Sequence, residues 1–96
     1  MIAMLKTLQV KYYKVKAGQN LEGIAETFSV SSRLLAKING LTAEPYVGQI
    51  LEIPRERGNV YVVRAGDTKE LLCGSVERFE RLNGTDAFYI GMKVII

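Results

Sequence analysis

Few of the side chains that enzymes use as nucleophiles or bases are present among the 96 residues of this chain. There is no histidine and only one cysteine, Cys73, which excludes Ser-His-Asp and Cys-His catalytic sites, Cys/His zinc sites and an intrachain disulfide. The ten acidic residues still permit the carboxylate pair of a glycoside hydrolase. Most of them fall at expected helix-surface positions, such as Glu22, Glu26, Glu77 and Glu80. We therefore expect no enzyme, no metal and no cofactor, and a Cys73 that serves as a small buried apolar residue.

Charge and hydropathy limit the partners and the location of the chain. A net charge of +3 could assist binding to nucleic acid or cell-wall phosphate, but it is too small and scattered to indicate either. We expect no nucleic-acid partner. No stretch approaches the ~20 apolar residues of a membrane span. The first residues lack the apolar core and cleavage pattern of an export signal, so we expect synthesis in the cytoplasm.

The chain contains one pattern twice. Residues 13–54 and residues 61–96 share an aromatic-x-Val start, an Ala-Gly turn, an Asn-Gly pair and a closing Tyr-aliphatic-Gly segment. Gly18 and Gly66 are 48 positions apart, but Asn39 and Asn83 are only 44 apart. The second copy is therefore shorter by about one turn of helix. An internal repeat of this kind indicates two copies of one supersecondary unit.

The first copy predicts a strand, two helices and a second strand. Alternation over residues 12–16 is typical of a half-buried strand. Asn20 and Ser31 are suited to cap two short helices, and the Asn39-Gly40 pair is suited to end the second one. A closing strand follows Gly48. The side chains expected to face the core are Tyr13, Val15, Ala17, Leu21, Ile24, Ala25, Phe28, Leu34, Leu35, Ile38, Leu51 and Ile53.

The second copy repeats this order with a reduced first helix. Thr68 takes the capping position, and only residues 69–72 precede the Cys73-Gly74 pair, so about one helical turn is expected. Ser75 is suited to cap the next helix, which Asn83-Gly84 ends. The side chains expected to face the core are Tyr61, Val63, Val76, Phe79, Leu82, Val94 and Ile96.

The first copy resembles the LysM module. The segments that carry the resemblance are YKVKAGQNLEGIAETFSVSSRLLAKINGL and YVGQILEIP, within residues 13–54. Residues 61–96 resemble a shortened copy, in which RAGDT and RLNG are intact. The resemblance implies an α+β fold of two βααβ modules, each a two-stranded antiparallel sheet with helices on one face. The expected division is an N-terminal tail (1–11), a first LysM module (12–54), a charged linker (55–59) and a shortened LysM-like module (60–96).

The resemblance also implies a function, which is non-catalytic binding of glycans that contain N-acetylglucosamine, chiefly bacterial peptidoglycan and also chitin. In the family the binding groove lies between the loop after the first strand and the loop before the second strand. Carried over by position, the glycan-binding residues are Gly18, Gln19, Asn20, Leu21, Gly23, Gly40, Leu41, Thr42, Ala43, Glu44 and Pro45. A second groove, reshaped by the missing helical turn, would be lined by Gly66, Asp67, Thr68, Gly84, Thr85 and Asp86.

These residue types suit an acetamido group, which offers one N–H, one C=O and one methyl. Glycines let the loop backbone approach the sugar, and the side chains of Leu21, Leu41 or Pro45 can cover the methyl. Each net hydrogen bond contributes only ~1 kcal/mol, so one shallow groove is expected to bind weakly and several grooves to gain through effective concentration. Asn39 and Asn83 are expected to bond the local backbone rather than sugar.

A second interpretation is a protein–protein adaptor in which glycan binding is weak or lost. The shortened second copy, the apolar tail and the apolar terminus Val94-Ile95-Ile96 favour a surface for self-association or for another envelope protein. LysM proteins without export signals resemble those of spore-envelope assembly or of phage. The cell wall or the spore envelope of a bacterium is therefore the expected site of action.

Overall fold

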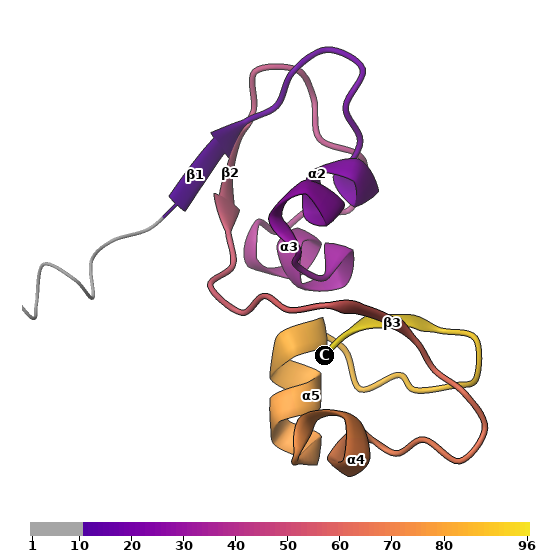
Figure 1. Cartoon of the computed structure of the whole chain (residues 1–96). Coiled ribbons are helices and arrows are strands. Elements are labelled where there is room, and N and C mark those ends of the chain that lie inside the picture. The colour runs from indigo at the N-terminus through magenta and orange to yellow at the C-terminus, as the bar shows by residue number, and fades with distance from the viewer. Residues whose placement is uncertain (1–10) are drawn as a thin grey trace, which may run out of the picture.

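The chain folds into two βααβ units that follow each other along the sequence (Figure 1). The computed structural model describes residues 11–96, so the expected N-terminal tail lies outside the described residues except for Lys11. The first unit consists of β1 (Lys11–Lys14), α2 (Leu21–Phe28), α3 (Ser32–Ile38) and β2 (Ile50–Ile53). The second unit consists of β3 (Val60–Val62), α4 (Lys69–Cys73), α5 (Val76–Asn83) and β4 (Lys93–Ile95). Each unit pairs its two strands antiparallel, which confirms the expected α+β fold.

Side-chain caps define where α2, α3, α4 and α5 begin. In each case the side-chain oxygen accepts a hydrogen bond from the backbone N–H three residues further on, as expected for Asn20, Ser31, Thr68 and Ser75. Such a cap contributes ~1 kcal/mol to helix stability. The first helix of the second unit is shorter, as expected, because α4 has five residues where α2 has eight.

Each unit has a separate hydrophobic core. The buried members are Val15, Ile24, Ala25, Val30, Leu35, Leu51 and Ile53 in the first unit, and Val63, Phe79, Met92 and Val94 in the second. Three expected core positions are wrong. Val76 is only half-buried and is not among the side chains packed against the second core. Ala17 is exposed, because β1 ends at Lys14 and the strand alternation no longer applies there. Ile38 is 40% exposed, because this last residue of α3 lines an open hollow beside Pro54.

One asparagine in each unit joins the second helix to the closing strand. Asn39 Nδ2 donates to the carbonyls of Leu35 (2.8 Å) and Glu52 (2.9 Å), and its Oδ1 accepts from the Glu52 N–H (2.8 Å). Asn83 makes the equivalent three bonds, one to the Phe79 carbonyl (3.0 Å) and two to the Ile95 backbone (3.0 and 2.8 Å). Both side chains are therefore engaged with the backbone, as expected, and are not free to contact a ligand.

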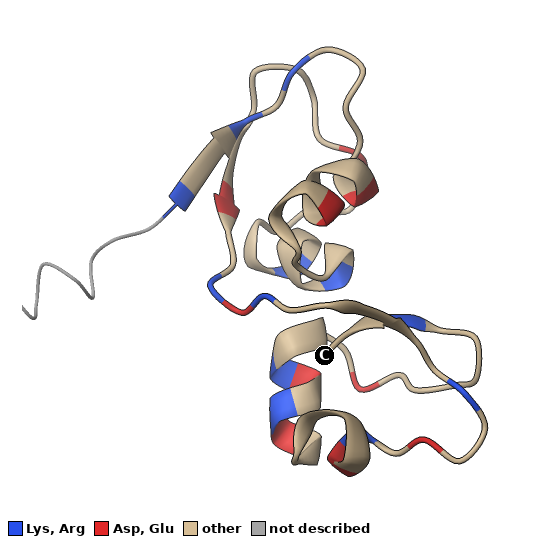
Figure 2. Ribbon diagram, in the orientation of Figure 1, with Lys and Arg blue, Asp and Glu red and all other residues tan. Residues whose placement is uncertain are grey.

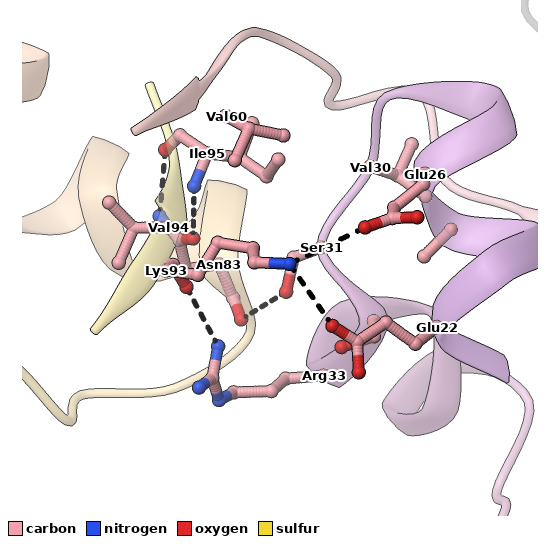
Figure 3. A pocket seen from close by; sticks show the side chains of 12 residues that line it. Glu22, Glu26, Val30, Ser31, Arg33, Val60, Asn83, Lys93, Val94 and Ile95 are labelled. Atoms are coloured by element: carbon pink, nitrogen blue, oxygen red, sulfur yellow. Dashed lines mark hydrogen bonds and ion pairs between the residues drawn. The ribbon is translucent and has the colours of Figure 1, made fainter. Parts of the chain in front are cut away.

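The two units pack directly on each other through α2, α3, α5 and β4 (Figure 3). Ser31 Oγ donates to the Asn83 carbonyl over 2.8 Å, and both residues are buried. At the edge of this contact Lys93 Nζ lies 3.3 Å from Glu22 Oε1 and 3.4 Å from Glu26 Oε2. The pKa of Lys93 is raised, first by the hydrogen bond to Glu22 and then by that to Glu26.

The linker also contacts both units. The Gly58 N–H donates to the Ser29 carbonyl of the first unit (3.0 Å), and Asn59 exchanges two hydrogen bonds of 2.9 Å with Ile96. Ile95, expected at an exposed assembly surface, is instead buried, with its Cγ2 3.1 Å from the position of a Cβ on Gly58. The orientation of the two units therefore depends on direct contacts and on a docked linker.

Gly84 provides a test of this packing, because Gly40 is its exact counterpart in the repeat. Both glycines adopt the left-handed backbone conformation, with φ of +66° for Gly84 and +62° for Gly40. A Cβ on Gly84 would lie 2.6 Å from Leu34 Cα in the first unit, whereas a Cβ on Gly40 would meet nothing within 4 Å. Both alanine substitutions should cost ~1 kcal/mol of backbone strain. Gly84→Ala should cost a further ~1–3 kcal/mol of overpacking.

Urea unfolding of Gly84→Ala and Gly40→Ala measures this difference in the free energy of unfolding. Equal losses would mean that the two units do not pack closely in solution.

Candidate functional site

The two loops expected to bind glycan lie side by side in the first unit (Figure 1). The β1–α2 loop covers residues 15–20 and the α3–β2 loop covers residues 39–49. The Leu21 N–H donates to Glu44 Oε1 over 2.7 Å and so joins the start of α2 to the second loop. The carboxylate sits at the positive end of the helix dipole, where a negative charge is favoured. The structure thus brings the two expected segments together.

Most of the expected binding residues are open to solvent. The exposed ones are Gly18, Gln19, Asn20, Gly23, Gly40, Thr42, Ala43 and Glu44. Leu21 and Leu41 are half-buried, because each also packs against the core. Pro45 is buried, so its ring does not face the surface as the sequence analysis expected. The candidate site is therefore an exposed, largely backbone surface with two leucine side chains at its base.

Gln19 in the first loop and Gly23 in α2 have structural roles in addition to the expected binding role. Gln19 Oε1 accepts from the Lys16 N–H (2.8 Å) and its Nε2 donates to the Tyr13 hydroxyl (2.6 Å). Gln19 thus holds the loop in shape. A Cβ on Gly23 would lie 3.1 Å from Asn20 Oδ1, so the missing side chain leaves room for the helix cap.

The second unit builds the same loop support with a carboxylate. Asp67 Oδ2 accepts from the Arg64 N–H (2.7 Å) and from the Tyr61 hydroxyl (2.8 Å). The pKa of Asp67 is lowered, first by the backbone hydrogen bond from Arg64 and then by that from Tyr61. The pKa of Tyr61 is raised, chiefly because its hydroxyl donates to Asp67.

This difference predicts that the β3–α4 loop of the second unit, which contains Asp67, contributes a pH-dependent part of the stability. Because the folded-state pKa of Asp67 lies below its unfolded value of ~3.9, its stabilisation is present above that pH and is lost as the pH falls through the folded pKa. Asp67→Asn should lower stability at neutral pH and flatten the acid loss. Urea midpoints of both proteins at neutral and acid pH measure the effect, and parallel pH profiles would contradict it.

The counterpart of the candidate site in the second unit is altered at two places. Gly84, expected to line a second groove, is half-buried, and the side on which a Cβ would stand faces the backbone of Leu34 in the first unit. Lys69 Nζ lies 2.7 Å from the Asp86 carbonyl and 2.7 Å from Glu80 Oε2. The other expected residues, Gly66, Asp67, Thr68, Thr85 and Asp86, remain exposed or half-buried.

The hollow between the two units does not suit a sugar. It has a volume of about 40 Å³ and is lined by residues that include Glu22, Ser31, Arg33 and Lys93 (Figure 3). That volume holds only a few water molecules.

Acidic and basic residues are intermixed on α5 and on the linker (Figure 2).

Within residues 11–96 no group of three or more His, Cys, Asp or Glu side chains is placed to hold a metal ion. No helix in that range has the length and apolar character needed to cross a bilayer. Cys73 is half-buried against the second core, and burial raises the pKa of its thiol. A raised thiol pKa disfavours the reactive thiolate.

Comparison with protein families identifies the first unit. Residues 13–54 match the model described as LysM domain. A LysM domain is a binding module rather than a catalytic one, and it implies binding of peptidoglycan or a related N-acetylglucosamine glycan. The match does not include the second unit.

Solved structures similar to this chain include two spore cortex-lytic enzymes, both named SleL. The Bacillus megaterium QM B1551 enzyme is 25% identical with a TM-score of 0.46, and the match covers 91% of this chain and 22% of that one. The Bacillus cereus enzyme is 20% identical with a TM-score of 0.45, covering 92% of this chain and 23% of that one. This chain thus spans less than a quarter of either enzyme. No curated protein matches it.

Proposed function

We propose that the chain is a non-catalytic glycan-binding protein whose first unit recognises N-acetylglucosamine in peptidoglycan, with chitin as a related ligand. The observation that carries this proposal is the LysM match over residues 13–54, together with the exposed loops that the Leu21–Glu44 hydrogen bond joins. The contacts proposed are those of Gly18, Asn20, Leu21, Gly23, Gly40, Leu41, Thr42, Ala43 and Glu44.

The chemistry of the loops fits an acetamido group. The N–H groups of Gly18 and Thr42 donate to no atom of the described residues, so they are available to a ligand carbonyl. The half-buried Leu21 and Leu41 can cover the acetamido methyl. The Glu44 carboxylate can accept from the ligand N–H. A few net hydrogen bonds of ~1 kcal/mol correspond to a dissociation constant on the order of 1 mM for one short oligomer.

The proposed site of action is the cell wall or the spore envelope of a bacterium, where the glycan is a polymer. A weak site suits such a ligand, because many copies of the sugar raise the effective concentration at each site.

Ala43 and Ala87 provide a matched pair for testing the site, because both are exposed in the loop before the closing strand. An N-acetylglucosamine oligomer should shift the amide resonances of Gly18, Gly23 and Thr42. Ala43→Tyr should weaken this binding about tenfold or more, ~1.4 kcal/mol, because the ring would fill the space between the loops. Ala87→Tyr should leave it unchanged. An absence of shifts in the first unit of the wild-type protein would refute the proposal.

A second candidate function, an assembly adaptor, is favoured by apolar side chains that the fold leaves exposed. Tyr46 and Val47 are 70% and 63% exposed, and the equivalent Tyr89 and Ile90 are 57% and 68% exposed. These two exposed apolar pairs form the tips of the two units, and they suit contacts with a second copy or with another envelope protein.

Sedimentation velocity separates the two candidates. The glycan-binding protein should remain a monomer, and an adaptor that self-associates should form an oligomer that added N-acetylglucosamine oligomer does not change. Tyr46→Ser with Tyr89→Ser should dissociate such an oligomer, because both substitutions remove exposed apolar surface. An oligomer that these substitutions leave intact would show that the tips are not its interface.

A further inference from the structure

Lys69 occupies in the second unit the place that Leu21 occupies in the first. Each residue follows the capping residue and is the first residue of its helix, α2 or α4. Leu21 packs its side chain against the core of the first unit. Lys69 instead extends its side chain toward α5 and the loop before β4, and only 16% of that side chain is exposed.

The Lys69 ammonium has three partners, which lie in α5 and in the loop before β4. Its Nζ donates to the Asp86 carbonyl (2.7 Å) and to Glu80 Oε2 (2.7 Å). It also lies 5.6 Å from the centre of the Phe79 ring, within the range of a cation–π contact. The ammonium thus bridges the start of α4 to the loop that the sequence analysis expected to line a second groove.

The two units therefore join their loops with different chemistry. In the first unit the link runs from the Leu21 backbone N–H to the side chain of Glu44, which is exposed to solvent. Because this carboxylate is exposed and hydrogen-bonded to Leu21 through one oxygen only, a ligand N–H can reach its other oxygen without breaking the link. In the second unit a ligand would have to separate the Lys69 ammonium from two hydrogen-bond partners, and the Lys69 side chain is only 16% exposed. Separating a partly desolvated charge from its partners is costly.

We propose that Lys69 closes the second unit to sugar, so that the tandem has a single glycan site in its first unit. This inference rests on the proposed glycan-binding function. It explains why the exposed residues Gly66 and Thr68 can keep the loop pattern of the repeat without providing a second site.

The test replaces Lys69 with the residue found in the first unit. In Lys69→Leu, an N-acetylglucosamine oligomer should shift the amide resonances of Gly66, Thr68 and Asp86, in addition to those of Gly18 and Thr42. In the wild-type protein the shifts should be confined to the first unit. Arg81→Ala is the control, because it removes one positive charge from an exposed position of α5 and leaves the loops untouched.

A reciprocal transplant tests the same idea in the first unit. Ala36 occupies the repeat position of Glu80, so Leu21→Lys with Ala36→Glu places the ammonium and its carboxylate partner there. This double variant should lose the glycan shifts at Gly18 and Thr42. Thermal unfolding and the dispersion of the amide spectrum report whether each variant remains folded.

The outcomes separate this inference from the proposed function. Glycan shifts at Gly66 and Thr68 in the wild-type protein, or no gain there in a folded Lys69→Leu, would overturn the closure by Lys69. Binding that survives in the folded transplant would do the same. A wild-type protein with no shifts at Gly18 or Thr42 would refute the proposed function, and the gain at Gly66 and Thr68 in Lys69→Leu would then decide the role of Lys69 by itself.

Discussion

The hydrogen bonds of one asparagine side chain in each unit are the constraint on which the rest of the structure depends. A sheet of two strands with three or four residues each is marginal in water, because it has few ladder bonds. Asn39 and Asn83 bind the backbone of the closing strand on one side and the last turn of the second helix on the other. The loop that follows each asparagine therefore leaves the helix at a defined place beside the first loop.

The asparagine of the second unit, Asn83, also takes part in the contact between the two units. Asn83 is fully buried and its own carbonyl accepts from Ser31, which is also the cap of α3. Gly84 follows it and lies against the backbone of Leu34. The helix end that positions the loop of the second unit is thus the part that packs on the first unit. This packing places one side of Gly84, which was expected to line a second groove, against the first unit.

The two units show how one framework can carry different surfaces. Both hold the first loop through a tyrosine hydroxyl and a neighbouring backbone N–H, with the neutral Gln19 in one unit and the charged Asp67 in the other. Both join the two loops across the site, with the exposed Glu44 in one unit and the largely buried Lys69 in the other. The framework tolerates either choice, because the core and the asparagine bonds do not involve these side chains.

The sequence by itself determined the order of the elements, their caps, the shortened α4 and most of the two cores, because these follow from periodicity and from hydrogen bonds between near neighbours. It also indicated the first-unit loops, through the resemblance to the LysM module. It could not show that Ile95 and Pro45 are buried, that Gly84 packs against Leu34 or that Lys69 joins α4 to the loop before β4. Those outcomes depend on contacts between residues far apart in the chain, and only the tertiary structure decides which of them form.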